Sequence, residues 1–161
     1  MSLSRAEVAI APMRRADLAE VMAIEVGAFA LPWTEEMFVN ELARGTLSEL
    51  LIARLPDAGN PPPLGGYICL WVVTDELHIN NLAVDPRWRR RGIAAALLTA
   101  ALDRGLAGGA RAAYLEVRVS NLAAQGLYRR FHFAPVGVRT RYYTHPIEDA
   151  LIMRREPLSR A

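Results

Sequence analysis

The sequence contains no lysine, and all 19 of its Lys and Arg residues are arginine. This absence excludes every chemistry that depends on a lysine side chain, including Schiff-base catalysis, a P-loop lysine and a lysine general base. Cysteine is almost absent as well. The single Cys69 excludes an internal disulfide framework and any metal site built from several cysteines. We therefore expect a protein without a bound metal.

Long apolar runs are also missing, because no run reaches the roughly 18 residues that a membrane span requires. The first residues carry no signal core, and the formal net charge of +2 is too low to favour a nucleic-acid partner. We expect a cytoplasmic protein that binds neither nucleic acid nor membrane. With 161 residues, 52% of them hydrophobic, the chain can build a full core, and we expect one domain over residues 1–161.

Hydrophobic periodicity and turn residues predict a mixture of strands and helices. Strands are expected over residues 8–11, 49–55, 64–74, 77–84, 112–117, 134–143 and 149–154. Helices are expected over residues 16–28, from an N-cap at Thr34 to residue 43, and over residues 92–106 and 121–131. The strand at 112–117 follows a strand–helix unit, so it should lie parallel to the strand at 77–84. The predicted fold class is α/β, a mixed sheet with helices on both faces.

The segment Leu82–Ala95, LAVDPRWRRRGIAA, joins a predicted strand to a predicted helix through an arginine-rich loop. The first amides of a helix have no internal partners, and the helix dipole makes their end attractive to anions. Gly92 lets a ligand approach the backbone closely. This pattern is typical of a phosphate site, but a solvated basic turn before a helix explains the charges as well. The loop matches neither the Walker A motif nor the dinucleotide-binding fingerprint.

Several ordered motifs resemble one enzyme family. Residues 89–94, RRRGIA, are similar to the Q/R-x-x-G-x-G/A motif of the GNAT acetyltransferases. YLEVRVSN at 114–121 and GLYRRFHF at 126–133 resemble that family's LEVR-x-SN and LY-x-x-x-GF segments, with His132 where the family has glycine. FALPWTEEMF at 29–38 and the tail at 138–153 resemble RimI-type N-terminal acetyltransferases. The resemblance spans about residues 17–155, nearly the whole chain.

The resemblance implies a GNAT fold, a mostly antiparallel sheet whose central parallel strand pair splays apart to hold acetyl-CoA. It implies that Glu116 is the general base and Tyr128 the general acid. It also places Trp33, Tyr142 and Tyr143 beside the acceptor peptide. The cofactor-binding residues that it implies are Leu82, Ala83, Val84, Arg89, Arg90, Arg91, Gly92, Ile93, Ala94, Ala95 and Asn121.

The chemistry of acetyl transfer is compatible with these roles. An α-amino group has a reference pKa of about 7.7–8.0, so it must lose a proton before it attacks, and a carboxylate such as Glu116 can accept it. A phenol such as Tyr128 can protonate the leaving thiolate. From the residues alone, Glu116 equally fits an ion pair with Arg118 or Arg141, and Tyr128 fits a core position. Direct transfer needs no acyl-enzyme, and Cys69 is expected to be a buried small hydrophobe.

The resemblance further implies a protein N-terminus as acceptor, typically the N-terminal alanine of a small-subunit ribosomal protein. Two alternatives stay open: a GNAT enzyme for a small-molecule amine, and a non-catalytic acyl-CoA-binding module. Glu25 and Glu148 are surface charges by default, which could attract a cationic acceptor. The sequence leaves open the oligomeric state and whether His132 adopts the left-handed conformation of the glycine that it replaces.

Overall fold

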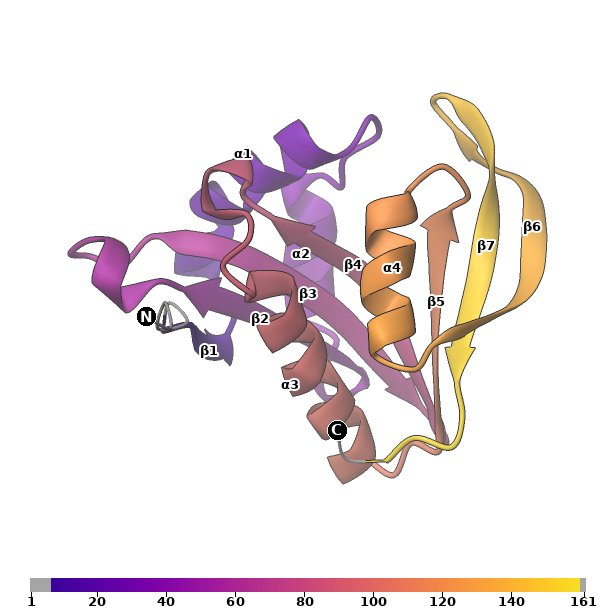
Figure 1. Ribbon diagram of the computed structural model, residues 1–161. Coiled ribbons are helices and arrows are strands. Elements are labelled where there is room, and N and C mark those ends of the chain that lie inside the picture. The colour runs from indigo at the N-terminus through magenta and orange to yellow at the C-terminus, as the bar shows by residue number, and fades with distance from the viewer. Residues whose placement is uncertain (1–6, 160–161) are drawn as a thin grey trace, which may run out of the picture. The chain divides into compact units, whose positions relative to one another are not determined.

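The computed structural model describes residues 7–159. Within that range, seven strands form one hydrogen-bonded sheet in the order β1-β2-β3-β4-β5-β7-β6 (Figure 1). The strands are β1 (Ala9–Pro12), β2 (Ser48–Arg54), β3 (Leu64–Val73), β4 (Glu76–Val84), β5 (Ala112–Arg118), β6 (Ala134–Thr144) and β7 (Ile147–Arg155). The α-helices are α1 (Leu18–Ala28), α2 (Glu35–Leu42), α3 (Ile93–Ala107) and α4 (Leu122–Arg130). Each predicted strand and helix is present, with only its ends displaced.

The sheet is mixed, as predicted. β4 pairs with β5 in parallel, from Glu76 opposite Ala112 to Ile79 opposite Leu115. β1 with β2, β5 with β7, and β6 with β7 are antiparallel pairs. The predicted N-cap is confirmed, because the Thr34 hydroxyl accepts a hydrogen bond from the Met37 amide at 3.2 Å. No helix within residues 7–159 is both long and apolar enough to cross a membrane.

The chain divides into two compact units, and β3, β4 and α3 each contribute residues to both. The first unit contains the chain up to Cys69 together with Asn81–Ala100. The second contains Leu70–Asn80 and the chain from Ala101 onwards. The two units are described in turn.

In the first unit, β3 lies between two helical layers. Tyr67 and Cys69 are fully buried in a cluster that includes Phe38 of α2 and residues of α1. The preceding residue, Gly66, meets α3 instead, since a Cβ there would lie 3.0 Å from the Ile93 side chain and 2.8 Å from the Ala83 carbonyl oxygen. Because successive residues of a strand point to opposite faces, helices cover both faces of the strand here.

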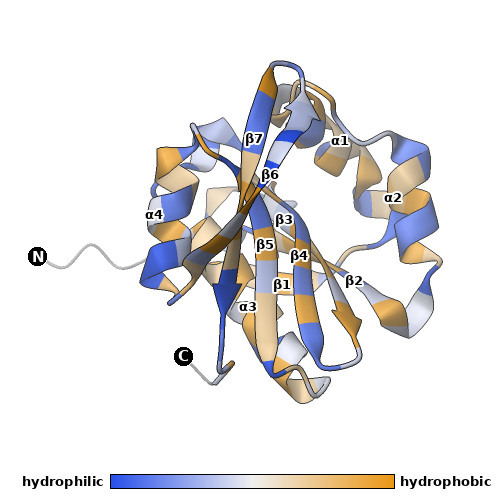
Figure 2. Cartoon of the chain, turned by 90° about the vertical axis from the view of Figure 1, so that its right-hand side faces the viewer, coloured by the Kyte–Doolittle hydropathy of each residue, from blue (hydrophilic) through white to orange (hydrophobic). Residues whose placement is uncertain are grey.

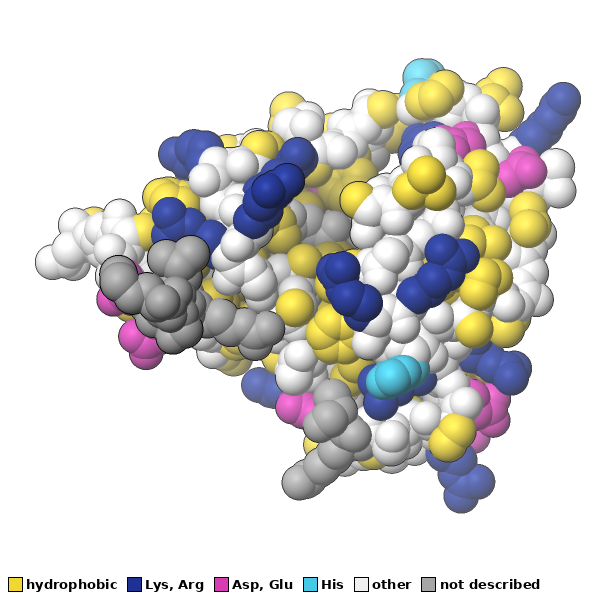
Figure 3. Space-filling view, in the orientation of Figure 1, with side chains coloured by type: hydrophobic (Ala, Val, Ile, Leu, Met, Phe, Trp, Pro, Cys, Tyr) yellow, Lys and Arg dark blue, Asp and Glu magenta, His cyan; other side chains and the backbone are white. Residues whose placement is uncertain are grey.

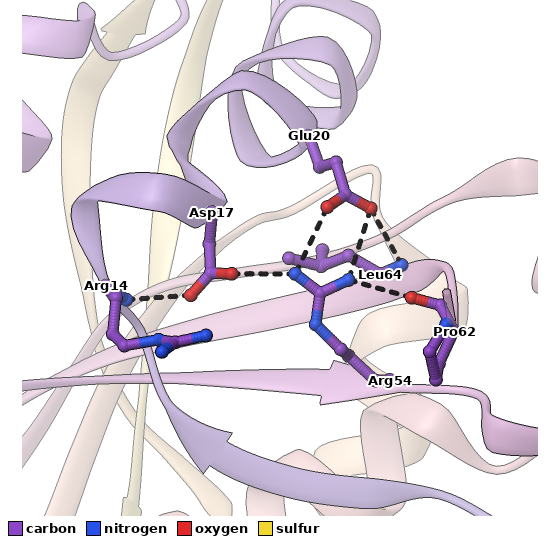
Figure 4. A network of polar contacts seen from close by, with 6 residues as sticks. All are labelled: Arg14, Asp17, Glu20, Arg54, Pro62 and Leu64. Atoms are coloured by element: carbon purple, nitrogen blue, oxygen red, sulfur yellow. Dashed lines mark hydrogen bonds and ion pairs between the residues drawn. The ribbon is translucent and has the colours of Figure 1, made fainter. Parts of the chain in front are cut away.

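A polar network fastens the start of α1 to β2 in the same unit (Figure 4). The Arg54 guanidinium donates to Asp17 at 2.7 Å, to Glu20 at 3.1 Å and to the Pro62 carbonyl at 2.9 Å. Glu20 also accepts from the Leu64 amide at 3.1 Å. One arginine thus ties the first helix to β2 and to the beginning of β3.

The second unit contains the hairpin of β6 and β7 and the amphipathic α4. Hydrophobic and hydrophilic bands alternate along α4 (Figure 2), and Tyr128 is buried while Leu122 is exposed. β6 bulges, because Arg139 pairs with Ala150 and Tyr143 pairs with Glu148. Three residues of β6, Thr140, Arg141 and Tyr142, therefore stand opposite Asp149 alone.

Candidate active site

The loop into α3, in the first unit, is held by Asp85. Its carboxylate accepts from the Arg87 amide at 2.9 Å and from the Arg87 guanidinium at 2.8 Å. These hydrogen bonds lower the pKa of Asp85. The backbone then turns sharply, since Arg90 and Gly92 both adopt left-handed φ values of 64° and 75°. Residues in this conformation can turn successive amides toward one point, a geometry that binds anions.

The first turn of α3 adds further donors to this loop. The Ala96 amide donates to the Gly92 carbonyl at 2.9 Å, so the amides of Ile93 to Ala95 belong to the turn that a helix cannot satisfy internally. Four arginines of the loop are exposed, and arginine side chains project from the surface beside it (Figure 3). They are Arg87, Arg89, Arg90 and Arg91. The buried Trp88 Nε1 has no hydrogen-bond partner among the described residues. This loop fits a phosphate-containing ligand.

Glu25 forms a second polar cluster in the first unit, and the expectation that it is a surface charge was wrong. It is only 1% exposed. Its carboxylate accepts from the Trp33 amide at 3.1 Å, from the Asn81 side-chain amide at 3.1 Å and from the Tyr67 hydroxyl. Burial and the hydrogen bond to Glu25 raise the pKa of Tyr67. The half-buried Trp33 ring lies 5.1 Å from that of Phe38.

Glu116, in the second unit, pairs with Arg139. The Arg139 Nε lies 2.6 Å from the Glu116 Oε1, so the partner is neither of the two arginines that the sequence suggested. Tyr142 also hydrogen-bonds to the carboxylate, and this bond raises the pKa of Tyr142. The Glu116 side chain is 27% exposed. A carboxylate in this position is accessible to a ligand.

Arg118 instead holds the turn between β6 and β7. Its guanidinium donates to Glu148 at 3.2 Å, to the Pro146 carbonyl at 3.1 Å and to the His145 carbonyl at 3.2 Å. It also stacks 4.2 Å from the centre of the Tyr143 ring. Glu148 accepts from the Ser120 amide at 2.7 Å, and that bond lowers the pKa of Glu148. Glu148 is therefore engaged in fixing the hairpin.

Tyr128 is buried on α4, with its ring 6.1 Å from that of Phe133. Burial, assisted by Tyr143, raises the pKa of Tyr128 to about 12. Burial and the charge of Glu116 raise the pKa of Tyr143 to about 12 as well. Both phenols therefore keep their protons at neutral pH. Tyr143 thus contributes to the raised pKa of Tyr128, and Glu116 contributes to the raised pKa of Tyr143.

Three further positions of the sequence analysis are now defined. The Asn121 side-chain oxygen accepts from the Ala124 amide at 3.2 Å and caps α4, so its amide nitrogen is the group that could contact a ligand. His132 adopts a φ of 67°, the left-handed conformation of the glycine that it replaces. Cys69 is fully buried, as expected, and burial raises the pKa of its thiol to about 12.

The structure distributes the predicted site residues over its two units. Leu82–Val84, Arg89–Ala95 and Trp33 belong to the first unit, and Asn121, Glu116, Tyr128, Tyr142 and Tyr143 belong to the second. Sequence reasoning missed the Arg139 partner of Glu116 and the Tyr67 and Asn81 partners of Glu25. One signal was available for Glu25, because it lies on the apolar face of its helix at the spacing of Leu18, Val21 and Ile24.

Comparisons with known proteins agree on one family. The sequence model of the Acetyltransferase (GNAT) family matches residues 18–133. A protein from Bacillus subtilis (strain 168), whose name proposes [ribosomal protein bS18]-alanine N-acetyltransferase activity, is 38% identical over 92% of this chain and 95% of its own. The N-alpha-acetyltransferase RimI of Mycobacterium tuberculosis (strain ATCC 25618 / H37Rv) is 33% identical over 97% of both chains. The crystal structure of the ribosomal-protein-S18-alanine N-acetyltransferase from Escherichia coli superimposes with a TM-score of 0.81, at 33% identity over 96% of both chains.

Proposed function

Because the chain belongs to the GNAT family and is an acetyl-CoA-dependent N-acetyltransferase, we propose that its acceptor is the N-terminal alanine of ribosomal protein bS18. The acceptor is inferred from relatives that cover nearly the whole chain and carry this activity in their names. One observation at the site supports acid–base catalysis of the acetyl transfer. An accessible carboxylate, Glu116, shares the second unit with a buried phenol, Tyr128, that stays protonated at neutral pH.

In the proposed reaction, Glu116 accepts a proton from the acceptor α-ammonium, directly or through a water. The neutral amine then bonds to the acetyl carbonyl carbon, the carbon–sulfur bond breaks, and the nitrogen releases its second proton to water. Tyr128 supplies the proton that the leaving sulfur takes up. Burial suits Tyr128 to this task because it keeps the phenol neutral until the sulfur needs its proton. Cys69 has no part, because it is buried and its thiol stays protonated at neutral pH.

The proposed acetyl-CoA contacts follow the loop into α3. The backbone of Leu82, Ala83 and Val84 would hold the pantetheine arm, and the amides of residues 90–95 would hold the pyrophosphate. The left-handed backbone at Arg90 and Gly92 supports this assignment, as do the exposed arginines beside it. Asn121 would contribute its side-chain amide nitrogen. When bound, acetyl-CoA supplies the activated acetyl group as a thioester.

The acceptor peptide is assigned to the aromatic side chains Tyr142 and Tyr143, with Trp33 as a further contact. Tyr142 is exposed, and the rings of Tyr142 and Tyr143 lie 5.1 Å apart in an edge-to-face arrangement. Arg118 stacks on Tyr143 and fixes the turn that follows both residues at the end of β6. These rings and Glu116 together would contact the first residues of a peptide whose terminal amine reaches the carboxylate.

Intact-mass analysis of a peptide panel tests the proposal. The panel contains peptides with N-terminal Ala, Ser, Met and Gly, an N-terminally blocked peptide with an internal lysine, and spermidine as a small amine. We expect one acetyl group on the free alanine peptide and none on the blocked peptide. Acetylation of the blocked peptide or of spermidine alone would refute an α-amine acceptor.

A further inference from the structure

We propose that Arg139 occupies, in the free protein, the place on Glu116 that the α-ammonium of the acceptor takes, so that the acceptor must displace it. This inference rests on the proposed function, because it assumes that Glu116 meets the acceptor amine. It assigns Arg139 a role that the sequence did not suggest. Arg139 would weaken the binding of every acceptor and favour those that compete well for the carboxylate.

The register of the sheet brings the two side chains together across an intervening strand. Glu116 on β5 pairs with Ile152 on β7, and Arg139 on β6 pairs with Ala150 on β7. Ile152 and Ala150 are two residues apart, so all four side chains point to one face. The β7 residue that pairs with Arg139 is Ala150, whose side chain is a single methyl group. This small side chain leaves room for the Arg139 side chain to extend over β7 to the Glu116 carboxylate.

The chemistry of the guanidinium makes it an inert substitute for an ammonium. Both groups carry one positive charge and donate N–H hydrogen bonds to a carboxylate. The guanidinium keeps its proton at any physiological pH, whereas an α-ammonium loses its proton near pH 8. Arg139 can therefore neutralise Glu116 without becoming a nucleophile. A lysine at the same position would present an amine that the enzyme could acetylate.

The ion pair is open to solvent, as a displaceable contact requires. The Arg139 side chain is 56% exposed, and exposed ion pairs contribute little free energy. Its guanidinium carbon also lies 5.9 Å from the centre of the Tyr142 ring, which offers a resting contact when the carboxylate is taken. Arg118 differs, because its side chain is 28% exposed and is bound to Glu148 and two carbonyls of the turn. Of these two arginines, Arg139 is therefore the one that an acceptor amine can displace from its carboxylate.

The first test measures the affinity of the alanine peptide for CoA-saturated wild-type, Arg139→Gln and Arg141→Gln proteins. Arg141→Gln is the matched control, because it removes the same charge two residues away on the same strand. We expect Arg139→Gln to bind the peptide about two- to fivefold more tightly, the range that an exposed ion pair predicts, and Arg141→Gln to bind it unchanged. Equal affinity for Arg139→Gln and wild type, or an equal gain in both variants, would overturn the proposal. Urea unfolding of each variant verifies that it folds.

A second test places an amine where the guanidinium lies. Arg139→Lys is incubated with acetyl-CoA and mapped by mass spectrometry, with Arg141→Lys as control. Each variant then contains a single lysine, because the natural chain has none. The introduced amine nitrogen would bond to the acetyl carbon, its proton would pass to Glu116, and CoA would leave with a proton from Tyr128. We expect acetylation at position 139 and none at 141. Acetylation at neither position, or equally at both, would count against the proposal.

The two tests separate this inference from the proposed function. If wild-type protein acetylates no peptide of the panel, the proposed function fails. If wild-type protein acetylates the alanine peptide but Arg139→Gln gains no affinity, only the role of Arg139 fails.

Discussion

Glu25 and Tyr67 form a buried hydrogen bond between α1 and β3, in which the phenol donates to the carboxylate. Both residues are almost fully inaccessible, at 1% and 0% exposure. The carboxylate also accepts from the Trp33 amide and from Asn81 on β4. All three donors are neutral, so these contacts are hydrogen bonds and not ion pairs. They come from β3, from β4 and from the segment between α1 and α2. The cluster fixes the position of Trp33, one of the proposed acceptor contacts.

We expect Glu25→Ala to lower the free energy of unfolding by about 3 kcal/mol, because it leaves several buried donors without an acceptor. Glu25→Gln should cost less, about 1–2 kcal/mol, since one oxygen remains. Urea unfolding measures both values. The exposed Asp103 on α3 provides the control, and Asp103→Ala should change stability by no more than about 0.5 kcal/mol. A loss below about 1 kcal/mol for Glu25→Ala would show that the cluster contributes little.

Replacing Glu116 by glutamine should remove the proposed base while preserving the shape of the side chain. We expect kcat for the alanine peptide to fall by about 100-fold or more. The KM for acetyl-CoA should be unchanged, because the proposed pyrophosphate contacts lie in the loop into α3. Steady-state kinetics measures both quantities, with Glu76→Gln on β4 as the control carboxylate. Turnover within a factor of two of wild type would rule out Glu116 as the base.

Tyr128→Phe removes one hydroxyl and keeps the ring that packs beside Phe133. If Tyr128 protonates the leaving sulfur, kcat should fall by about 100-fold, while the affinities for acetyl-CoA and peptide stay within a factor of about three. Tyr114→Phe, which alters a half-buried tyrosine on β5, is the matched control. Equal kinetics for the two variants would assign Tyr128 a packing role alone.

The buried tyrosines predict a loss of stability in alkali. An unfolded tyrosine ionises near pH 10, whereas burial raises the pKa of Tyr128 to about 12 in the folded chain. Its contribution is therefore complete below about pH 10 and is lost as the pH rises toward 12, because only the unfolded chain releases the proton in that interval. Each such tyrosine contributes a loss of at most about 1.4 kcal/mol per pH unit.

Urea unfolding at pH 9, 10 and 11 checks this expectation. The stability difference between wild type and Tyr128→Phe should change in favour of the variant as the pH rises, since phenylalanine cannot ionise. Parallel curves for the two proteins over this interval would contradict a raised pKa for Tyr128.

Two glycines should respond in opposite ways to alanine. A Cβ at Gly66 would lie 2.8 Å from the Ala83 carbonyl oxygen, a backbone atom that cannot move aside, so Gly66→Ala should cost about 1–3 kcal/mol. At Gly27, in α1, a Cβ would meet nothing within 4 Å. Gly27→Ala should therefore stabilise the protein by up to about 1 kcal/mol through helix propensity. Urea unfolding of both variants decides the point, and a neutral Gly66→Ala would contradict the tight β3–β4 contact.

Much of the fold could be predicted because it depends on local patterns. The alternation of apolar residues located the strands, and Thr34 marked the start of α2 by a side-chain bond that spans only three residues. The strand–helix–strand order around α3 was sufficient to predict the parallel pairing of β4 with β5. The burial of Cys69 followed from its apolar neighbours in β3.

The partners of the charged side chains could not be predicted in the same way. The sequence by itself determined the elements, the family motifs and the residues capable of the chemistry, because hydrophobic period and motif spacing are properties of neighbouring residues. Only the tertiary structure decided that Glu116 meets Arg139 rather than Arg118 or Arg141, and that Glu25 is buried against Tyr67 and Asn81. Those contacts join residues 23 to 56 positions apart. They depend on strand register and helix packing, which no local pattern specifies.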